Sequence, residues 1–427
     1  MNVLLLGGGG REHAIAWRIS QSPLLSKLWI APGNAGTEAF GENVEGVTIT
    51  DGTAVVALAE RVQADLVVVA PDDPLAAGVV DALAEAGIPA FGPTRAAAEI
   101  EWSKSFAKDL MARAGIPTST SQAFDDLDSA VRYVAELGGP CVVKADGLAL
   151  GKGVTVCDTP DEAITAIDAA MRQRAFGESG TRVVVEERMY GRETSAHAFS
   201  DGVSVRHMPF SCDHKPVFDG DRGPNTGGMG VYSPPAWLTP ADAEAIRTEV
   251  TERTIDALRI AGRPFAGVLY PGMMLTATGP RVVEFNARFG DPETQVLLPK
   301  LRSDLLAILD ACARGHLAAV PVEWDEVSTV GVVMASGGYP GSYTTGHPIE
   351  GLEDVDSDVQ VFFAGVKRQD ARLVTSGGRV LCVVASGATM EEARARAYDN
   401  VARIRFEGAH FRTDIGATAS QPLVFAR

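Results

Sequence analysis

The first hundred residues alternate short apolar runs with helical patterns, and this alternation constrains the fold more than any other feature. After its first residue, the segment 65–70 is continuously apolar, as in a parallel strand that is covered on both faces. An apolar run at 2–6, four glycines and a helical pattern from Arg11 to about Ile19 form a strand–turn–helix unit. We therefore predict a doubly wound N-terminal α/β domain, whose ligands bind beyond the carboxyl ends of its strands.

The glycine turn at 7–10 can offer backbone N–H groups and the positive end of a helix dipole to an anion. It matches a dinucleotide-binding fingerprint poorly, because Glu12 stands where a small third residue is needed and no acid follows the second strand, 28–31. NAD binding is therefore disfavoured. Two alternatives stay open: a smaller phosphate-bearing ligand, with Asn34 and Gly36 as a second lip of the crevice, or a turn that serves only packing.

Composition narrows the class of protein. A chain of 427 residues can form two to four domains, and a net charge of −17 argues against nucleic acid or an anionic membrane as the main partner. Five scattered cysteines without a C-x-x-C pair indicate a reducing compartment, with neither a disulfide framework nor a zinc site. The N-terminus does not resemble a signal peptide, and no apolar run approaches the roughly 20 residues of a membrane span. We expect a soluble cytoplasmic protein.

A glycine-rich loop at 145–153 lies between two predicted strands, 141–144 and 154–157. It is not a Walker A loop, because its glycine spacing differs, Gly153 follows Lys152, and a strand follows instead of a helix. A flap of this kind, with Lys144 and Lys152, can fold over a triphosphate and expose N–H groups. The alternative is a tight hairpin with solvated lysines. We favour the flap, because so many glycines cost conformational entropy that a plain hairpin need not lose.

The strand predicted at 281–289 carries Glu284, Asn286 and Arg288 on one side. The residues that alternate with them are apolar and predict a buried face on the other side: Val283, Phe285, Ala287 and Phe289. Carboxylate and amide oxygens two positions apart can hold Mg²⁺, which takes its other ligands from water and phosphates. Arg288 can then neutralise a phosphoryl or acyl-phosphate oxygen. The turn that follows adds Asp291 and Glu293. An ordinary solvated polar face is the alternative.

Three further segments give weaker signals. The strand predicted at 182–187 ends in two acids and is followed by Glu193; such acids usually only solubilise, but beside a nucleotide they can meet adenine and ribose. Residues 213–215, Asp-His-Lys, carry three different charge chemistries, and His214 alone is best interpreted as structural. The loop 223–230 has four glycines in eight residues, typical of a disordered segment or a ligand-ordered lid. From about residue 328 we predict an α+β domain with a mainly structural role.

Assembled, these segments resemble the glycinamide ribonucleotide synthetases (phosphoribosylamine–glycine ligases), a family of the ATP-grasp superfamily. The resemblance covers nearly the whole chain. Its most specific parts are residues 8–13, 32–34, 91–94, 144–154, 213–215, 223–230, 284–295, 403–408 and 411–416. It implies an N-terminal α/β substrate-binding domain at 1–102, an ATP-grasp domain at 103–327 with a mobile lid at about 119–192, and a small α+β domain at 328–427. The implied partners are small molecules only, with no nucleic acid or membrane, and the implied state is a monomer.

The resemblance also implies a reaction. ATP, glycine and 5-phosphoribosylamine give glycinamide ribonucleotide, ADP and phosphate through a glycyl phosphate, an early step of purine synthesis. Transfer of a phosphoryl group to a carboxylate depends mostly on positioning and charge neutralisation. Lys, Arg and a divalent ion therefore suffice to catalyse it without a covalent nucleophile.

By resemblance, Glu284 and Asn286 match the family's ligands for Mg²⁺ (or Mn²⁺). The residues expected to bind ATP are Lys104 and Lys144, the flap residues Gly147, Gly151, Lys152 and Gly153, and the acids Glu186, Glu187 and Glu193. The residues expected where acyl phosphate and substrates meet are Asp213, Lys215, Arg288 and Asp291. The residues expected to bind the other substrates are Gly9, Gly10, Asn34, Gly36 and Glu293.

The chain departs from the family pattern in three places. Ala70-Pro-Asp72 stands where the family commonly has Gly-Pro-Glu, and Trp102 replaces a small residue before Ser-Lys. The strand at 270–275 has no carboxylate, so the number of metal ions stays open. Three other functions stay as alternatives: an ATP-grasp enzyme for another acid such as bicarbonate, a nucleotide-binding module without turnover, and, more remotely, a nicotinamide dehydrogenase.

Overall fold

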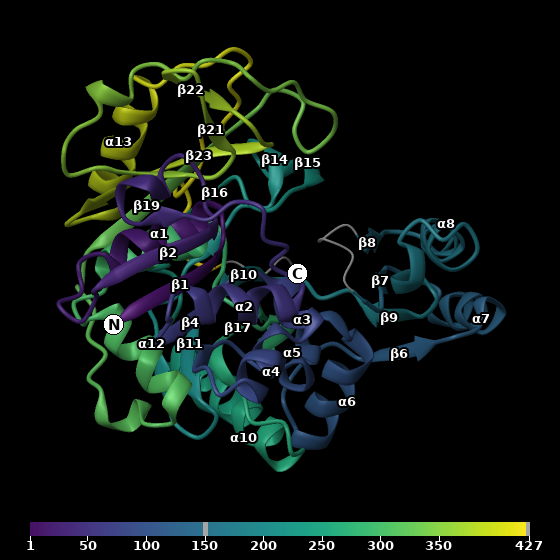
Figure 1. Ribbon diagram of the computed structural model, residues 1–427. Coiled ribbons are helices and arrows are strands. Elements are labelled where there is room, and N and C mark those ends of the chain that lie inside the picture. The colour runs from purple at the N-terminus through teal and green to yellow at the C-terminus, as the bar shows by residue number, and fades with distance from the viewer. Residues whose placement is uncertain (148–152, 424–427) are drawn as a thin grey trace.

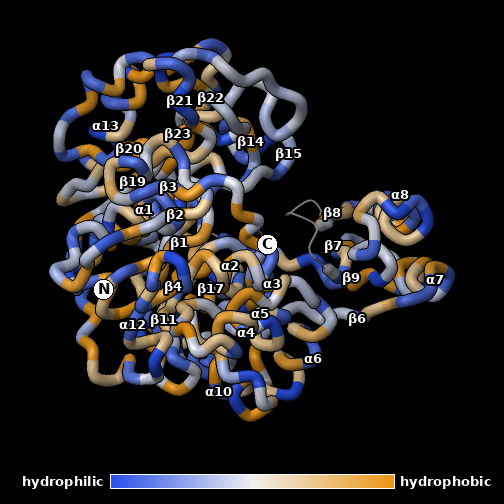
Figure 2. The backbone as a smooth tube through the Cα atoms, in the orientation of Figure 1, coloured by the Kyte–Doolittle hydropathy of each residue, from blue (hydrophilic) through white to orange (hydrophobic). Residues whose placement is uncertain are grey.

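A computed structural model describes residues 1–147 and 153–423 of the chain. Figure 1 shows a large body from which a smaller unit, built of α7, α8 and β6–β9, projects to one side. Figure 2 shows apolar segments within both parts. The fold is the expected one, a mixed α/β and α+β molecule that begins with a doubly wound domain.

The N-terminal domain is a parallel sheet in the order β3-β2-β1-β4-β5. Alternate residues of β1 enter two different cores, Leu4 and Leu6 on one face and Val3 and Leu5 on the other, so both faces are covered. Its elements are β1 (Asn2–Gly7), α1 (Gly10–Ile19), β2 (Lys27–Pro32), η1 (Thr37–Ala39), β3 (Glu42–Asn43), α2 (Gly52–Arg61), β4 (Leu66–Val69), α3 (Asp72–Ala77), α4 (Val79–Glu85), β5 (Ala90–Phe91) and α5 (Arg95–Trp102).

The helical pattern at about 76–86, which Gly87 follows, predicts a single helix, but the observed helix is not continuous. It begins earlier, at Asp72, and is divided into α3 and α4 by Gly78, whose φ is +84°. Left-handed backbone is accessible to glycine without steric cost, and it ends an α-helix.

The projecting unit, which we call the lid, is an antiparallel sheet in the order β6-β9-β7-β8 with α7 and α8 beside it. It has a hydrophobic core of its own. Helix α6 precedes it, with Ser103 as N-cap and Gly115 as left-handed C-cap, and the residue types at both positions predict these caps from sequence. These elements are α6 (Lys104–Ala114), β6 (Ser121–Phe124), α7 (Leu127–Leu137), β7 (Cys141–Ala145), β8 (Val154–Cys157), α8 (Pro160–Met171), η2 (Gly177–Gly180) and β9 (Val183–Glu187).

A second sheet, in the order β10-β17-β11-β12 with β18 also paired to β17, forms the base under the lid. Helices pack around it. Its elements are β10 (Arg192–Ser195), β11 (Ala198–Asp201), β12 (Val205–His207), α9 (Pro240–Ala245), the π-helical η3 (Ile246–Glu252), α10 (Arg253–Ile260), β17 (Ala266–Thr276), β18 (Gly279–Asn286), α11 (Glu293–Leu297), η4 (Leu298–Lys300), α12 (Leu305–Arg314) and η5 (Leu317–Ala319).

A third sheet, in the order β13-β16-β19-β23-β20, joins residues before and after position 328. Helix α13 packs on β19 and β23. Two hairpins, β14–β15 and β21–β22, extend from this part. The elements are β13 (Cys212–Asp213), β14 (Pro216–Phe218), β15 (Arg222–Asn225), β16 (Gly230–Ser233), β19 (Ser328–Ala335), η6 (Leu352–Asp354), β20 (Gln360–Phe363), β21 (Val366–Gln369), β22 (Arg372–Thr375), β23 (Arg379–Gly387) and α13 (Met390–Val401).

The strand predicted at 281–289 differs from the observed β18 in two ways. It ends at Asn286, so Arg288 lies in the following turn. The register also shifts, since Glu284 pairs with Gly272 but Val282 pairs with Met273. This bulge places Val282 in the core and leaves Val283 only partly buried. The expectation that Val283 is buried is therefore wrong, because one extra residue reverses the alternation of side chains.

Candidate active site

The expected metal ligands lie on β18. Asn286 Oδ1 accepts a hydrogen bond from Arg288 Nη2 at 3.0 Å, and Arg288 also pairs with Glu101 at 3.2 Å. Carboxylate and amide oxygens form a hard donor set that fits Mg²⁺, with water and phosphate completing its coordination. Among residues 1–147 and 153–423, no group of three or more His, Cys, Asp or Glu side chains has the arrangement of a metal site.

Lys215 is the electrostatic centre of this region. Its Nζ lies 3.5 Å from a carboxylate oxygen of Glu284 and 3.5 Å from one of Glu193. Lys215, with Lys144 and Lys104, lowers the pKa of Glu284 to about 2 although burial opposes the shift. The neighbouring carboxylates in turn hold the pKa of Lys215 well above its ordinary value, against the effect of burial. Both groups are therefore charged at neutral pH.

Two more ionisable groups lie beside Lys215. Burial raises the pKa of Asp213 to about 7, Lys215 opposing the shift and Glu293 adding to it. Glu293 is 3% exposed, and its Oε1 accepts a hydrogen bond from the Tyr270 hydroxyl at 2.6 Å. The structure thus brings Asp213, Lys215 and Glu293 into one charged neighbourhood.

The base of the lid holds a buried cluster of charges. Lys144 Nζ lies 3.1 Å from Glu186 Oε1 and donates to the Val283 carbonyl at 2.8 Å. Lys108 Nζ lies 3.2 Å from Glu186 Oε2, and burial lowers the pKa of Lys108 to about 8. Burial alone would raise the pKa of Glu186, but the two lysines lower it. The Glu186 side chain is therefore committed to the lysines.

The remaining expected ATP contacts lie around this cluster. Lys104 Nζ donates to the Gly147 carbonyl at 3.0 Å, and the Gly153 carbonyl accepts from Ala145 N at 2.8 Å. Glu187 pairs with Arg281 at 2.8 Å, on the exposed side of the strand. Gly151 and Lys152 lie outside the described residues.

The N-terminal crevice is lined by all three domains. Gly9 N donates to Glu12 Oε2 at 2.7 Å, and Arg11 N donates to Asp291 Oδ2 at 3.3 Å. Asp291 also pairs with Arg379 of β23 at 3.4 Å. The N-terminus of α1 thus already faces carboxylates of the protein itself, which is the electrostatic preference that such a terminus has for anions.

The second lip of the crevice is also joined to the C-terminal part. Asn34 Nδ2 donates to the carbonyls of Gly8 at 2.9 Å and Phe363 at 2.8 Å, and its Oδ1 accepts from Gly36 N at 2.8 Å. A Cβ at Gly10 would lie 2.7 Å from Gln295 Nε2, and one at Gly36 would lie 2.4 Å from the His13 ring. A side chain at Gly36 would therefore collide with the His13 ring, whereas one at Gly10 would have to displace the end of the Gln295 side chain.

Two residues that sequence reasoning missed belong to this region. Lys108 lies one helical turn after Lys104 on α6, and that i, i+4 spacing was the available signal. Arg379 carried no local signal, because a lone arginine at the start of a strand is common. The C-terminal domain, expected to be mainly structural, contributes Arg379 and the Phe363 backbone to the crevice.

The fold and these charges define the class. A doubly wound domain, a lid that carries Lys144, a β-sheet that carries Glu193 and Glu284, and a third domain joined to both are the architecture of an ATP-grasp enzyme. A biotin carboxylase from Campylobacter jejuni has this fold with a TM-score of 0.74 at 16% identity, over 99% of this chain and 95% of that chain.

The family follows from closer similarities. Family models of the phosphoribosylglycinamide synthetase N domain, ATP-grasp (A) domain and C domain match residues 1–101, 102–294 and 329–418. A phosphoribosylamine–glycine ligase from Mesorhizobium japonicum is 50% identical over 97% of this chain and 98% of its own length. A crystal structure of phosphoribosylamine–glycine ligase from Thermotoga maritima is 34% identical with a TM-score of 0.86, over 97% of this chain and all of that one. The chain belongs to the phosphoribosylglycinamide synthetase family.

Proposed function

We propose that this chain joins glycine to 5-phosphoribosylamine with ATP, releasing glycinamide ribonucleotide, ADP and phosphate. The observation that supports this best is the meeting of Lys215 with Glu284 and Glu193 beneath the lid lysines. Family membership over nearly the full chain supports the choice of substrates. Members of the family use ATP with a divalent metal ion, which we propose to be Mg²⁺, with Mn²⁺ as a substitute.

The proposed chemistry has two steps. A glycine carboxylate oxygen attacks the γ-phosphorus of ATP, and the bond to the leaving oxygen of ADP breaks. The amine of 5-phosphoribosylamine then attacks the carbonyl carbon of glycyl phosphate; phosphate leaves and the nitrogen loses a proton. Neither step needs a covalent nucleophile of the protein, because positioning and charge neutralisation lower both barriers.

Glu284 and Asn286 are proposed to hold the metal ion, which when bound neutralises phosphate charge. Lys104 and Lys144 are placed to bind phosphate oxygens, with Gly147, Gly151, Lys152 and Gly153 as the flap. Glu186 and Glu187 mark the adenine edge, and Glu193 the ribose. The flap residues are assigned by family resemblance alone.

Arg288 is proposed to bind the acyl-phosphate oxygens, since Glu101 and Asn286 hold its guanidinium at the end of β18. Asp213, Lys215 and Glu293 are proposed to hold glycine, with Asp213 accepting from its amine. Asp291, Gly9, Gly10, Asn34 and Gly36 are proposed to line the 5-phosphoribosylamine site. Arg379, the cation that faces Asp291, is added to this group.

The domains are proposed to divide at 1–102, 103–327 and 328–427, with the lid at about 119–192. A monomer in the cytoplasm without a nucleic-acid partner is proposed as its working state. Over the described residues, no helix has both the length and the apolar character needed to span a bilayer.

The test is ADP release in the presence of glycine and freshly formed 5-phosphoribosylamine. We expect release that depends on both substrates and on Mg²⁺. Release with bicarbonate or another acid, and none with glycine, would leave the superfamily but overturn the substrate assignment. Tight ATP binding by calorimetry without ADP under any substrate pair would instead indicate a binding module.

A further inference from the structure

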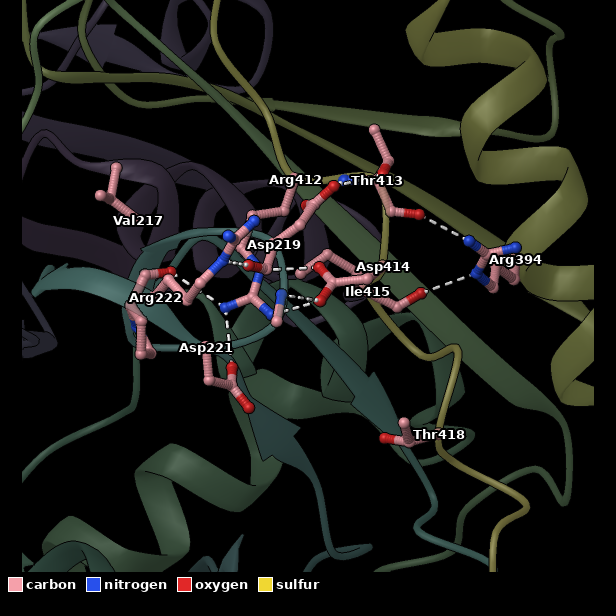
Figure 3. Close-up of polar contacts among 12 residues, drawn as sticks. Val217, Asp219, Asp221, Arg222, Arg394, Arg412, Thr413, Asp414, Ile415 and Thr418 are labelled. Carbon is pink, nitrogen blue, oxygen red and sulfur yellow. Dashed lines mark hydrogen bonds and ion pairs between the residues drawn. The ribbon is translucent and has the colours of Figure 1, made fainter.

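A segment of the C-terminal domain, residues 410–415, lies along hairpin β14–β15 (Figure 3). At its centre is Arg412, which is 1% exposed. Its Nη1 donates to the Pro216 carbonyl at 3.0 Å and to Asp221 Oδ1 at 2.9 Å. Its Nε and Nη2 donate to the two carboxylate oxygens of Asp414 at 2.8 and 2.7 Å. The guanidinium thus contacts the Asp414 carboxylate of its own segment and, on the hairpin, the Asp221 carboxylate and the Pro216 carbonyl.

Neighbouring residues of the same segment hold the rest of the hairpin. Asp414 Oδ2 also accepts from Gly220 N at 2.8 Å, and His410 Nε2 lies 2.9 Å from the Val217 carbonyl. Asp219 accepts from Thr413 N at 2.8 Å and from the Thr413 hydroxyl. Both the first strand and the turn of the hairpin are therefore fixed from one side.

Beyond this segment, the hairpin is supported by Val217, which packs in a small apolar core with Met229, Ala335 and Tyr339. Within the described residues, the two strands of the hairpin pair only with each other, and an isolated two-stranded hairpin is marginally stable in water. A buried guanidinium, by contrast, tolerates displacement poorly, because loss of a partner leaves a buried charge unpaired. Arg412 therefore sets where the hairpin lies.

Lys215 is the residue immediately before this hairpin. Its carbonyl accepts from Thr226 N and Thr226 Oγ1, both at 2.8 Å, and the next carbonyl, of Pro216, accepts from Arg412. The two carbonyls that follow Lys215 Cα are thus both held, and Lys215 Nζ lies 3.5 Å from Glu284 and from Glu193. A long lysine side chain reaches a fixed point only if its backbone is fixed.

We propose that Arg412 is a positioning residue for the ligation reaction: through the hairpin it places the Lys215 ammonium beside Glu284. The segment 411–416, one of the sequence motifs with no assigned role, then acts on a site in another domain. This inference rests on the proposed role of Lys215 in catalysis.

The test compares Arg412→Met with Arg394→Met. Arg394, on α13, donates to the carbonyls of Thr413 and Ile415, so it binds the same segment but has no described bond to the hairpin. We expect Arg412→Met to lower kcat at least tenfold with KM for ATP within twofold, and Arg394→Met to change kcat less than twofold. Arg412→Lys, which keeps the charge but loses the planar fork, should recover part of kcat.

Amide hydrogen exchange of peptides covering 216–225, measured without substrates, gives a second readout. We expect exchange to accelerate at least tenfold in Arg412→Met and to stay unchanged in Arg394→Met. A folded Arg412→Met protein with wild-type kcat overturns the proposal, as do equal losses of kcat in the two variants, which indicate general destabilisation.

If Arg412→Met does not fold, Asp221→Asn decides, because the Asp221 side chain is 69% exposed and its change leaves the Asp414 pair intact. We expect about a threefold loss of kcat, and an unchanged kcat overturns the proposal. A wild-type protein without ligase activity would refute the proposed function, while the exchange experiment would still report whether Arg412 holds the hairpin.

Discussion

Lys215 stands between two carboxylates, and its charge keeps Glu284 ionised throughout the physiological pH range. An ionised carboxylate close to three lysines is a suitable ligand for a divalent ion, because metal binding then releases no proton. At the scale of single residues, the site is therefore prepared electrostatically before any ligand arrives.

Glu284→Gln keeps the size of the side chain but removes its charge. We expect turnover to fall by about 10²-fold or more, the usual cost of losing one electrostatic contact to developing charge, and the Mg²⁺ requirement to rise. Steady-state kinetics with varied Mg²⁺ measures both effects. Glu323→Gln, which changes only an exposed pair with Arg302, is the control, and equal kinetics in the two variants would contradict the assignment.

Asp213 should give the reaction a pH dependence near neutrality, since burial raises its pKa to about 7. The ionised carboxylate holds an ammonium far better than the neutral acid does, so kcat/KM for glycine should fall as the pH drops below about 7. Asp213→Asn should lose this dependence. The effect on stability has the opposite sign: between about pH 4 and 7 the folded state holds a proton that the unfolded state releases, so this group's contribution decreases as pH rises.

Glu186 is the shared partner of two buried lysines, and it is 2% exposed. Glu186→Met should lower the free energy of unfolding by about 3 kcal/mol, because it leaves uncompensated buried charge. Denaturant unfolding measures this loss. The double variant Glu186→Met with Lys108→Met should recover part of it, and strictly additive losses would show that Lys108 and Glu186 do not interact.

At the scale of elements, local chemistry predicted most of what the structure contains. The Ser103 side chain accepts a hydrogen bond from Phe106 N at the start of α6, and the Thr159 side chain accepts one from Glu162 N at the start of α8. Such caps can be predicted because the residues that form them are close together in the sequence. The break at Gly78 and the bulge in β18 were missed. The bulge depends on how β18 pairs with β17, which alternation does not report. The break follows from the left-handed backbone of Gly78, since a glycine within a helical pattern does not by itself show where the helix ends.

The same division holds for the candidate site. Glu284, Asn286 and Lys144 stand in recognisable local patterns, so they could be selected from sequence. Arg379 reaches Asp291, and Arg412 reaches Pro216, across about 90 to 200 positions of the chain. A single sequence contains no local signal for such pairs.

Gly78 offers a test of the break between α3 and α4. Gly78→Ala should destabilise the protein by about 1 kcal/mol, because a φ of +84° strains a residue with a Cβ. The nearest atom to that Cβ would be 3.6 Å away, so strain and not collision is the cause. Gly78→Asn should cost less, since asparagine tolerates left-handed backbone; a stability gain in the alanine variant would contradict this account.

At the scale of the whole molecule, the third sheet binds the last hundred residues to the catalytic domain. β16 pairs with β19, and all four of its residues are buried. A protein truncated to 1–327 would expose this strand as a bare sheet edge, which favours aggregation. We expect such a protein to be insoluble or to lack a cooperative thermal transition by calorimetry; a soluble, cooperatively folded product would refute the dependence.

The lid differs from the rest of the molecule because it does not share its hydrophobic core with another domain. Its buried apolar residues form one cluster within 124–185, whereas the two larger clusters each mix residues from all three domains. We therefore expect the lid to move as one piece, because its own apolar core stays intact when it shifts, whereas a shift of another domain would open a core that it shares. Any such movement would have to keep or replace the polar contacts at the base of the lid, such as the bond from buried Lys144 to the Val283 carbonyl, because a buried charge left unpaired is costly.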